Sequence, residues 1–245
     1  MTTHSAPVVL ITGSARRVGA AIARHLHASG YDIVIHYRAS AATAQALQGD
    51  LEQARPGSTL CLHADLADIE RLPDLIADSI TRFGRLDALI NNASSFYPTP
   101  IGETRVEQWN ELFASNAQAP YFLAQAAAQP LRQQQGCIIN LVDLYASQPL
   151  TKHPVYCMAK AALAMMTLAL ARELAPEVRV NGIAPGAVLW PESGKSSAEQ
   201  QTMIARTPLG RVGTPEDIAK AALFLLRDAP FVTGQILRVD GGRSL

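Results

Sequence analysis

The chain has 245 residues, enough for one large α/β domain or two small ones, and 48% of them are hydrophobic, which excludes disorder. Lysine plus arginine and aspartate plus glutamate both number 21, so the formal net charge is zero and we expect no nucleic-acid or membrane partner. We expect no secretory signal at the N-terminus, and no apolar run that approaches the length needed to cross a bilayer.

The cysteines point to a reducing compartment. Cys61, Cys137 and Cys157 are scattered and show no CxxC spacing. An odd set of this kind is typical of buried free thiols in an intracellular protein. We therefore expect a cytoplasmic location.

Strand-like and helix-like patterns alternate along the whole chain. Apolar runs predict seven strands, at residues 8–12, 33–36, 59–63, 86–90, 137–142, 178–183 and 235–239. Helical spacing predicts helices at 17–29, 40–54, 69–83, 106–131 with a break near Pro120, 155–174 and 215–226. The alternation predicts a mostly parallel sheet with helices on both faces. Residues 185–207, rich in Pro, Gly and Ser, predict a mobile substrate loop followed by a short helix.

A glycine turn follows the first predicted strand directly. It runs Thr12-Gly-Ser-Ala-Arg-Arg-Val-Gly19 and opens the first helix. In this position the backbone N–H groups and the helix N-terminus face a pyrophosphate. The turn predicts a dinucleotide site, although an ordinary tight turn gives the same pattern.

The end of the second strand indicates which dinucleotide is bound. An NAD site usually carries an acid here to hold the ribose 2′-hydroxyl, and the sequence His36-Tyr-Arg-Ala-Ser40 has none. Arg38 and Ser40, with Arg17 nearby, suit a 2′-phosphate through charge-assisted hydrogen bonds. We therefore expect NADPH/NADP+, the alternative being solvated surface arginines.

Two further strand ends offer polar groups for the adenosine half of such a cofactor. Asp65-Leu66 follows the third strand and could accept a hydrogen bond from the adenine amine. Asn91-Asn92-Ala93 follows the fourth strand and could meet the adenosine ribose. Helix caps or loop turns are the alternatives for both.

Tyr156 and Lys160 are four residues apart, so they lie on one face of the helix at 155–174. An ammonium beside a phenol lowers the phenol's pKa from about 10, which predicts a proton donor near neutral pH. Asp143 ends the fifth strand, where α/β folds place chemistry. A chance Tyr-x-x-x-Lys, and a turn or cap role for Asp143, are the alternatives.

Together these motifs resemble the short-chain dehydrogenase/reductases. The matching residues run in order as Thr12-Gly13…Gly19, Asp65, Asn91-Asn-Ala93, Asn116, Tyr156-x-x-x-Lys160 and Pro185-Gly186. The resemblance implies a single Rossmann-like, doubly wound α/β domain over residues 1–245, a homotetramer, and Asn116, Tyr156 and Lys160 as catalytic residues. The implied cofactor contacts are Gly13, Arg16, Arg17, Val18, Gly19, His36, Tyr37, Arg38, Ser40, Asp65, Leu66, Asn91, Ala93, Ser94, Tyr156, Lys160, Pro185 and Gly186.

Two departures from that family narrow the resemblance. Arg17 replaces its usual middle glycine and Asp143 replaces its usual serine, and both changes, with residues 91–100, look like the pteridine reductases. That subfamily implies that Arg17 and Ser94 contact cofactor phosphate or pterin. It implies that Phe96 stacks on the pterin opposite the nicotinamide, and that Asp143 and Tyr156 move a proton to the ring. A loop aromatic folded into the core is the alternative for Phe96.

These residues predict an NADPH-dependent pteridine reductase that takes dihydropterins to tetrahydropterins, with oxidised pterins or folates as further substrates and no metal. A carbonyl reductase such as a 3-oxoacyl-carrier-protein reductase is the first alternative, and Asp143 in place of serine argues against it. A regulator that senses NADPH without turnover is the second. The set Asn116, Tyr156 and Lys160 argues against a regulator, because a sensor does not need it.

Overall fold

The structure is a computed structural model that describes residues 6–189 and 196–245. Within these residues seven strands form one sheet, in the order β3-β2-β1-β4-β5-β6-β7, and every neighbouring pair is parallel. The strands are β1 (Val8–Ile11), β2 (Asp32–Tyr37), β3 (Thr59–His63), β4 (Ala88–Asn91), β5 (Cys137–Leu141), β6 (Arg179–Pro185) and β7 (Ile236–Val239). The predicted seven-stranded α/β fold is confirmed, and the sheet is wholly parallel among the described strands.

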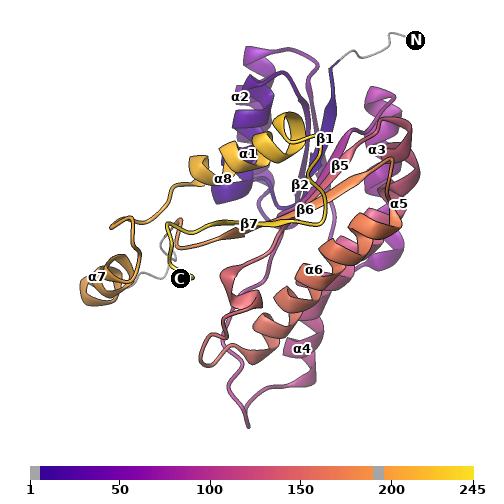
Figure 1. Ribbon diagram of the computed structural model, residues 1–245. Helices are drawn as coiled ribbons and strands as arrows, with labels where there is room; N and C mark the ends of the chain where they lie inside the picture. The colour runs from indigo at the N-terminus through magenta and orange to yellow at the C-terminus, as the bar shows by residue number, and fades with distance from the viewer. Residues whose placement is uncertain (1–5, 190–195) are drawn as a thin grey trace.

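Helices cover both faces of the sheet (Figure 1). One layer contains α1 (Arg17–Ala28), α2 (Ala41–Ala54) and α8 (Pro215–Leu223), and the other contains α3 (Leu72–Phe83), α5 (Ala119–Gln133) and α6 (Pro154–Glu173). Because both faces are covered, alternate strand residues enter two separate apolar cores. This explains why the strands are continuous apolar runs in the sequence.

The long helix predicted at 106–131 is three pieces. It consists of α4 (Val106–Phe113), a π-helical turn (Ala114–Gln118) and α5. Pro120 lies in the first turn of α5, where its missing N–H costs little, so the interruption comes before the proline. Such π turns are frequent at functional sites, and this one carries Asn116.

The irregular stretch predicted at 185–207 is partly described. β6 extends to Pro185, and α7 (Ser197–Ala205) is the short helix expected there. Figure 1 shows α7 apart from both helix layers, near the C-terminus. Residues 190–195 of the predicted substrate loop lie outside the described residues.

The expectation that no apolar run reaches membrane-spanning length was wrong. By length and composition alone, α6, with its 20 residues, is a helix that could cross a membrane. Its inner side packs against β5, β6 and the turn that follows β5. A helix that contributes to a protein core passes the same test, so this is weak evidence for a membrane span.

A ladder of buried polar side chains joins the centre of the sheet to α6. Asn91 donates through Nδ2 to Oδ1 of Asn140 at 2.8 Å, and Asn140 donates through Nδ2 to Oγ1 of Thr167 at 2.9 Å. All three side chains are buried. A buried amide that loses its partner is costly, so the ladder fixes α6 against β4 and β5. Because Tyr156 and Lys160 belong to α6, the ladder also fixes where these two residues lie relative to the sheet.

We predict that Asn140→Leu lowers the free energy of unfolding by about 1–3 kcal/mol, because it leaves the buried Nδ2 of Asn91 without an acceptor. Urea unfolding of both proteins measures the loss. The double variant Asn91→Leu/Asn140→Leu should recover most of it, since both partners are then apolar. A double variant that is less stable than Asn140→Leu would contradict a role for the pair.

Candidate active site

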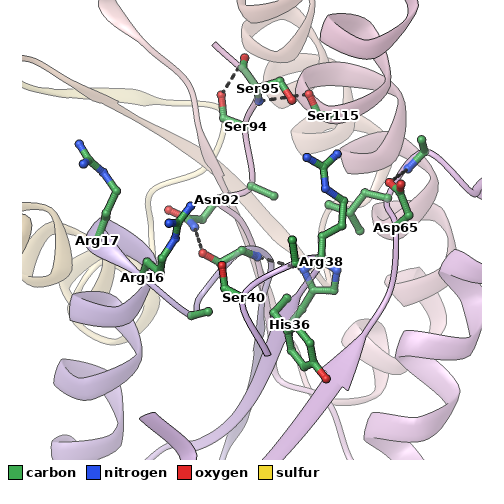
Figure 2. Close-up of a pocket in the computed structure, with 18 of the residues that line it drawn as sticks. Arg16, Arg17, His36, Arg38, Ser40, Asp65, Asn92, Ser94, Ser95 and Ser115 are labelled. Atoms are coloured by element: carbon green, nitrogen blue, oxygen red, sulfur yellow. Dashed lines mark hydrogen bonds between the residues drawn. The ribbon is translucent and has the colours of Figure 1, made fainter. Parts of the chain in front are cut away.

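The carboxyl ends of the strands meet at one edge of the sheet because the strands are parallel. A cavity of about 400 Å³ lies there, over the loops that follow the first four strands. The residues that line it come from the glycine turn, the end of β2, the loop after β3, the loop after β4, and α4 with its π turn. Figure 2 shows ten of them: Arg16, Arg17, His36, Arg38, Ser40, Asp65, Asn92, Ser94, Ser95 and Ser115.

The glycine turn is held by groups from the neighbouring strand ends. The Gly13 N–H donates to Nδ1 of His36 at 3.0 Å, and Asn92 Nδ2 donates to the carbonyls of Thr12 and Gly13 at 2.8 and 3.1 Å. A Cβ on Gly19 would lie 2.6 Å from the Gly13 oxygen and from Asn92 Nδ2. Only glycine therefore fits at position 19, and the chain comes close enough to present its backbone to a ligand.

The turn has groups that a phosphate would satisfy. Arg16, the N-cap residue of α1, makes no capping hydrogen bond through its side chain. The Oγ of Ser14 is buried and has no hydrogen-bond partner. Exposed backbone N–H groups at a helix N-terminus and an adjacent hydroxyl are anion-binding groups. The predicted pyrophosphate contact fits this turn.

Three arginines surround the cavity. Figure 2 shows Arg16 and Arg17 on one side and Arg38 on the other. Arg17 has a φ of 54°, in the left-handed region that glycine favours, which costs about 1–2 kcal/mol for other residues. Ser40 begins α2 without capping it through its side chain. Arg38 and Ser40 both line the cavity just past the end of β2.

Not all of the residues predicted to contact the adenosine half line the cavity. Asp65 and Leu66 line the cavity, and Asp65 also forms a turn by accepting from the Ala67 N–H at 3.0 Å. The side chain of Asn91 does not line it, because it is buried in the ladder with Asn140. Asn92 takes that place, together with Ala93.

Other predicted cofactor residues have structural contacts of their own. Tyr37 packs its ring on His63, with centroids 5.4 Å apart, and Val18 is half-buried beside it in the cavity wall. Pro185 and Gly186 do not line the cavity. Gly186 is needed for packing, since a Cβ there would lie 2.7 Å from the Cα of Asp240.

His36 braces the site with both ring nitrogens. Nδ1 accepts from Gly13, and Nε2 lies 3.1 Å from the carbonyl of Ala64, to which it donates. Burial lowers the pKa of His36 to about 4, so the ring is neutral at physiological pH. The family resemblance implies that His36 contacts the cofactor. In the structure His36 lines the cavity and also supports the glycine turn.

The catalytic residues predicted from the sequence are brought together at the end of β5. The Tyr156 hydroxyl donates to Oδ2 of Asp143 at 2.7 Å. Oδ1 of Asp143 accepts from the Tyr145 N–H at 3.0 Å, which caps a short 3₁₀ turn (Leu144–Ala146). Asp143 therefore serves as a cap and also contacts the tyrosine. Lys160 is buried and donates through Nζ to the Leu141 carbonyl at 2.8 Å.

The prediction that Lys160 gives Tyr156 a pKa below that of an ordinary tyrosine was wrong. Burial raises the pKa of Tyr156 well above 10, and the charge and hydrogen bond of Asp143 raise it further. The Lys160 ammonium lies 5.8 Å from the Tyr156 ring centroid, whereas the Asp143 carboxylate touches the hydroxyl. Burial also lowers the pKa of Lys160 to about 8. Tyr156 is thus held in its protonated form.

The loop after β4 adds Ser94 and Phe96 to this centre. Ser94 Oγ donates to Oδ1 of Asn116 at 2.7 Å, and the Ser94 hydroxyl near Tyr156 opposes the rise in the pKa of that tyrosine. Phe96 is 51% exposed, with its ring edge-on to Tyr156 at 4.8 Å. It stacks on His153 at 4.7 Å. The alternative that Phe96 folds into the core is therefore excluded.

Several residues of this site were missed by the sequence analysis. Asn92 and Thr12 lie within motifs that the sequence analysis identified, but their role in joining the loops after β4 and β1 was not predicted. Glu111 and Ser115 in α4 and its π turn, and His153 just before α6, gave no signal, because packing sets the orientation of these elements toward the site. Across the described residues, no group of three or more His, Cys, Asp or Glu side chains could hold a metal ion.

Comparison with known proteins relates the whole chain to nicotinamide-dependent enzymes. A family profile described as Enoyl-(Acyl carrier protein) reductase matches residues 13–244. Pteridine reductase 1 of Leishmania tarentolae is 38% identical, over 100% of this chain and 98% of that protein. L-fucose dehydrogenase of Mus musculus is 34% identical, over 100% and 91%. The 3-oxoacyl-(acyl-carrier-protein) reductase FabG of Staphylococcus aureus strain Mu50 is 31% identical, over 95% and 96%.

The support that His36 gives to the turn should depend on pH. Its folded pKa of about 4 lies below the ordinary 6.5, so between these values the unfolded chain binds more protons. The stabilisation is therefore complete above pH 6.5 and is lost as the pH falls toward 4. At about 1.4 kcal/mol per pKa unit, the parent should lose about 3 kcal/mol more than His36→Asn across this range.

Asparagine is the matched control because its Oδ1 can accept from the Gly13 N–H without titrating. Urea unfolding of both proteins from pH 7.5 to pH 4 measures the difference, and the carboxylates contribute equally to both curves. Parallel curves for the two proteins would contradict the assignment.

Proposed function

Because the chain belongs to the short-chain dehydrogenase/reductase family, whose members are oxidoreductases with a nicotinamide cofactor, we propose that it is an NADPH-dependent pteridine reductase. The proposed reaction is hydride transfer to a C=N bond of a dihydropterin, giving a tetrahydropterin; oxidised pterins and folates share the ring and extend the substrate class. The observation that carries the proposal is the hydrogen bond between Tyr156 and Asp143, at 2.7 Å. The full-length similarity to a pteridine reductase supports it.

The proton chemistry follows from this hydrogen bond. NADPH, when bound, supplies the hydride to the carbon of the C=N bond. The two electrons of the π bond then move to the nitrogen, which takes the proton of the Tyr156 hydroxyl. A tyrosine whose pKa is raised holds this proton throughout the physiological range. The resulting phenolate beside the Asp143 carboxylate is strongly disfavoured, so Tyr156 takes up a proton from solvent, and Asp143, which contacts its hydroxyl, is placed to pass that proton on.

The substrate side also suits a flat heterocycle. Phe96 offers an exposed aromatic ring next to Tyr156, and His153 covers one of its faces. The other face remains for a pterin ring, which would stack there opposite the nicotinamide. Ser94 and Arg17 lie at the adjoining loops, where their donors suit the polar edge of a pterin or a cofactor phosphate.

We assign the catalytic roles to Tyr156, Asp143, Lys160 and Asn116. Lys160 would hold the nicotinamide ribose, and Asn116 holds the loop after β4 by donating to the Ser95 carbonyl at 2.9 Å. Arg38 and Ser40, with Arg17, support the choice of NADPH, since residues 36–40 include no acid. A single domain over the whole chain, a homotetramer and a cytoplasmic location complete the proposal.

A second candidate is reduction of a 3-oxoacyl thioester. The similarity to a 3-oxoacyl-(acyl-carrier-protein) reductase favours it. Carbonyl reduction needs a neutral hydroxyl donor beside the tyrosine, and this chain has the carboxyl group of Asp143 there. We therefore rank it below pterin reduction.

The two candidates are separated by one panel of initial rates. NADPH oxidation by the parent enzyme is measured with dihydrobiopterin, dihydromonapterin, dihydrofolate and acetoacetyl thioesters. The proposal expects the highest kcat/KM with one of the dihydropterins. A preference for the acetoacetyl thioester would overturn it.

We predict that Arg38→Ala raises the KM for NADPH about tenfold to hundredfold and leaves that for NADH nearly unchanged. The lost charge-assisted contact to the 2′-phosphate is worth about 1.5–3 kcal/mol, and NADH lacks that phosphate. Initial rates with each cofactor at saturating dihydropterin make the comparison. Equal losses for both cofactors would contradict a contact between Arg38 and the 2′-phosphate, and no loss for either would show that Arg38 is a solvated surface residue.

We also predict that Asp143→Ser cuts kcat for dihydropterins sharply, by about 10²–10⁴-fold for a general acid–base group, with little change in NADPH affinity. Serine cannot supply the carboxylate that Tyr156 contacts. Tyr156→Phe, which keeps the ring but has no proton, is the reference for complete loss. If Asp143→Ser reduced dihydropterins at the parent rate, Asp143 would have no part in the proton transfer.

A further inference from the structure

We propose that Glu111 is a positioning residue for the substrate: its carboxylate binds the hydroxyl groups of Ser95 and Tyr97, and thereby keeps Ser94 and Phe96 turned toward the reacting centre. The inference rests on the proposed function, because the pterin is the ligand that Ser94 and Phe96 are proposed to contact.

The side chains of residues 94–97 alternate between exposed and half-buried. Ser94 and Phe96 are exposed, whereas Ser95 and Tyr97 are half-buried. In an extended chain, successive side chains point to opposite sides. Fixing the directions of Ser95 and Tyr97 therefore also fixes those of Ser94 and Phe96.

Glu111 in α4 lies within hydrogen-bond distance of two hydroxyls of this segment. Its Oε1 accepts from Ser95 Oγ at 3.3 Å, and its Oε2 accepts from the Tyr97 hydroxyl at 3.0 Å. The Gln108 carbonyl, 3.2 Å from the same Tyr97 hydroxyl, is a second acceptor that carries no charge. The Tyr97 ring packs beside Leu112 and Val155, in the small cluster that also contains Tyr156. A carboxylate has two acceptor oxygens, so one side chain holds both hydroxyls.

Other residues hold the backbone of the segment. The Ser95 N–H donates to Ser115 Oγ at 3.2 Å, and its carbonyl accepts from Asn116 Nδ2 at 2.9 Å. Figure 2 shows Ser95 beside Ser115 at the rim of the cavity. These bonds remain when Glu111 is replaced. Loss of Glu111 should therefore loosen Phe96 and Tyr97 without releasing the loop from α4.

The cavity adds a second consequence. Glu111 also lines the proposed cofactor cavity, where its negative charge repels a polyanionic dinucleotide. Removing the carboxylate should weaken substrate binding through Phe96 and leave cofactor binding unchanged or tighter. A general loss of structure would weaken both.

Glu111→Ala tests this in the full chain, with KM measured for dihydropterin and for NADPH. We expect the dihydropterin KM to rise about threefold to tenfold, the scale of one ordinary intramolecular hydrogen bond, and the NADPH KM to stay level or fall. Tyr97→Phe should reproduce most of the rise, because it keeps the ring and loses the hydroxyl. Glu107→Ala, on the same helix and paired only loosely with Arg105 at 3.9 Å, is the matched control and should change neither value. A parallel rise of both KM values in Glu111→Ala would overturn the proposal.

The double variant Phe96→Ala/Glu111→Ala tests whether Glu111 acts through Phe96. Once Phe96 is removed, Glu111→Ala should cause no further rise in the dihydropterin KM, whereas independent additive losses would contradict the proposal.

A measurement without substrate separates this proposal from the proposed function. Chymotrypsin cleavage after Phe96, followed by mass spectrometry, should be faster in Glu111→Ala than in the parent or in Glu107→Ala. If the parent reduced no pterin but cleavage was accelerated, the proposed function would fail and the role of Glu111 in orienting the segment would stand. Unchanged cleavage would overturn the role of Glu111 whatever the substrate.

Discussion

The hydrogen bond between Tyr156 and Asp143 is the interaction on which the account of this protein depends. It joins the first turn of α6 to the end of β5, with the two oxygens 2.7 Å apart. Because Tyr156 is buried and faces a carboxylate, the pKa of its hydroxyl is raised. The hydroxyl therefore keeps its proton at physiological pH until the substrate takes it. A serine in place of Asp143 would give the tyrosine a neutral neighbour, and no carboxylate charge would then raise the pKa of its hydroxyl.

Much of the remaining structure serves to fix that contact and the cavity next to it. The ladder from Asn91 through Asn140 to Thr167 sets α6 against the sheet. His36 and Asn92 hold the glycine turn from neighbouring strand ends. These supports are buried or half-buried side chains whose partners come from distant parts of the sequence. The site is therefore preorganised by the sheet, and its loops add the groups that choose the ligand.

The sequence predicted the fold well because its signals are local. Strands covered on both faces are continuous apolar runs, and Gly13 and Gly19 occupy positions where the backbone must turn or approach closely. The spacing of Tyr156 and Lys160, and the absence of an acid at residues 36–40, were equally visible.

What could not be predicted depends on three-dimensional contacts. Neighbouring asparagines look alike in the sequence, yet Asn91 is buried in the ladder and Asn92 lines the cavity. The rise in the pKa of Tyr156 needs the distance to Asp143, and the role of Glu111 needs the packing of α4 on the loop after β4. The membrane-like composition of α6 arises because a helix that packs against the sheet is apolar along much of its length. The π turn at Asn116 has no marker other than its contacts.

The most direct test of the central claim is an ultraviolet titration of the Tyr156 phenol. Subtracting the spectrum of Tyr156→Phe from that of the parent isolates this tyrosine from the others. We predict that Tyr156 remains protonated at pH 10, where half of ordinary tyrosine is ionised. We also predict that Asp143→Asn lowers the pKa of Tyr156, because it removes the carboxylate charge. A Tyr156 that ionised below pH 10 in the parent, or a pKa unaffected by Asp143→Asn, would contradict the central claim.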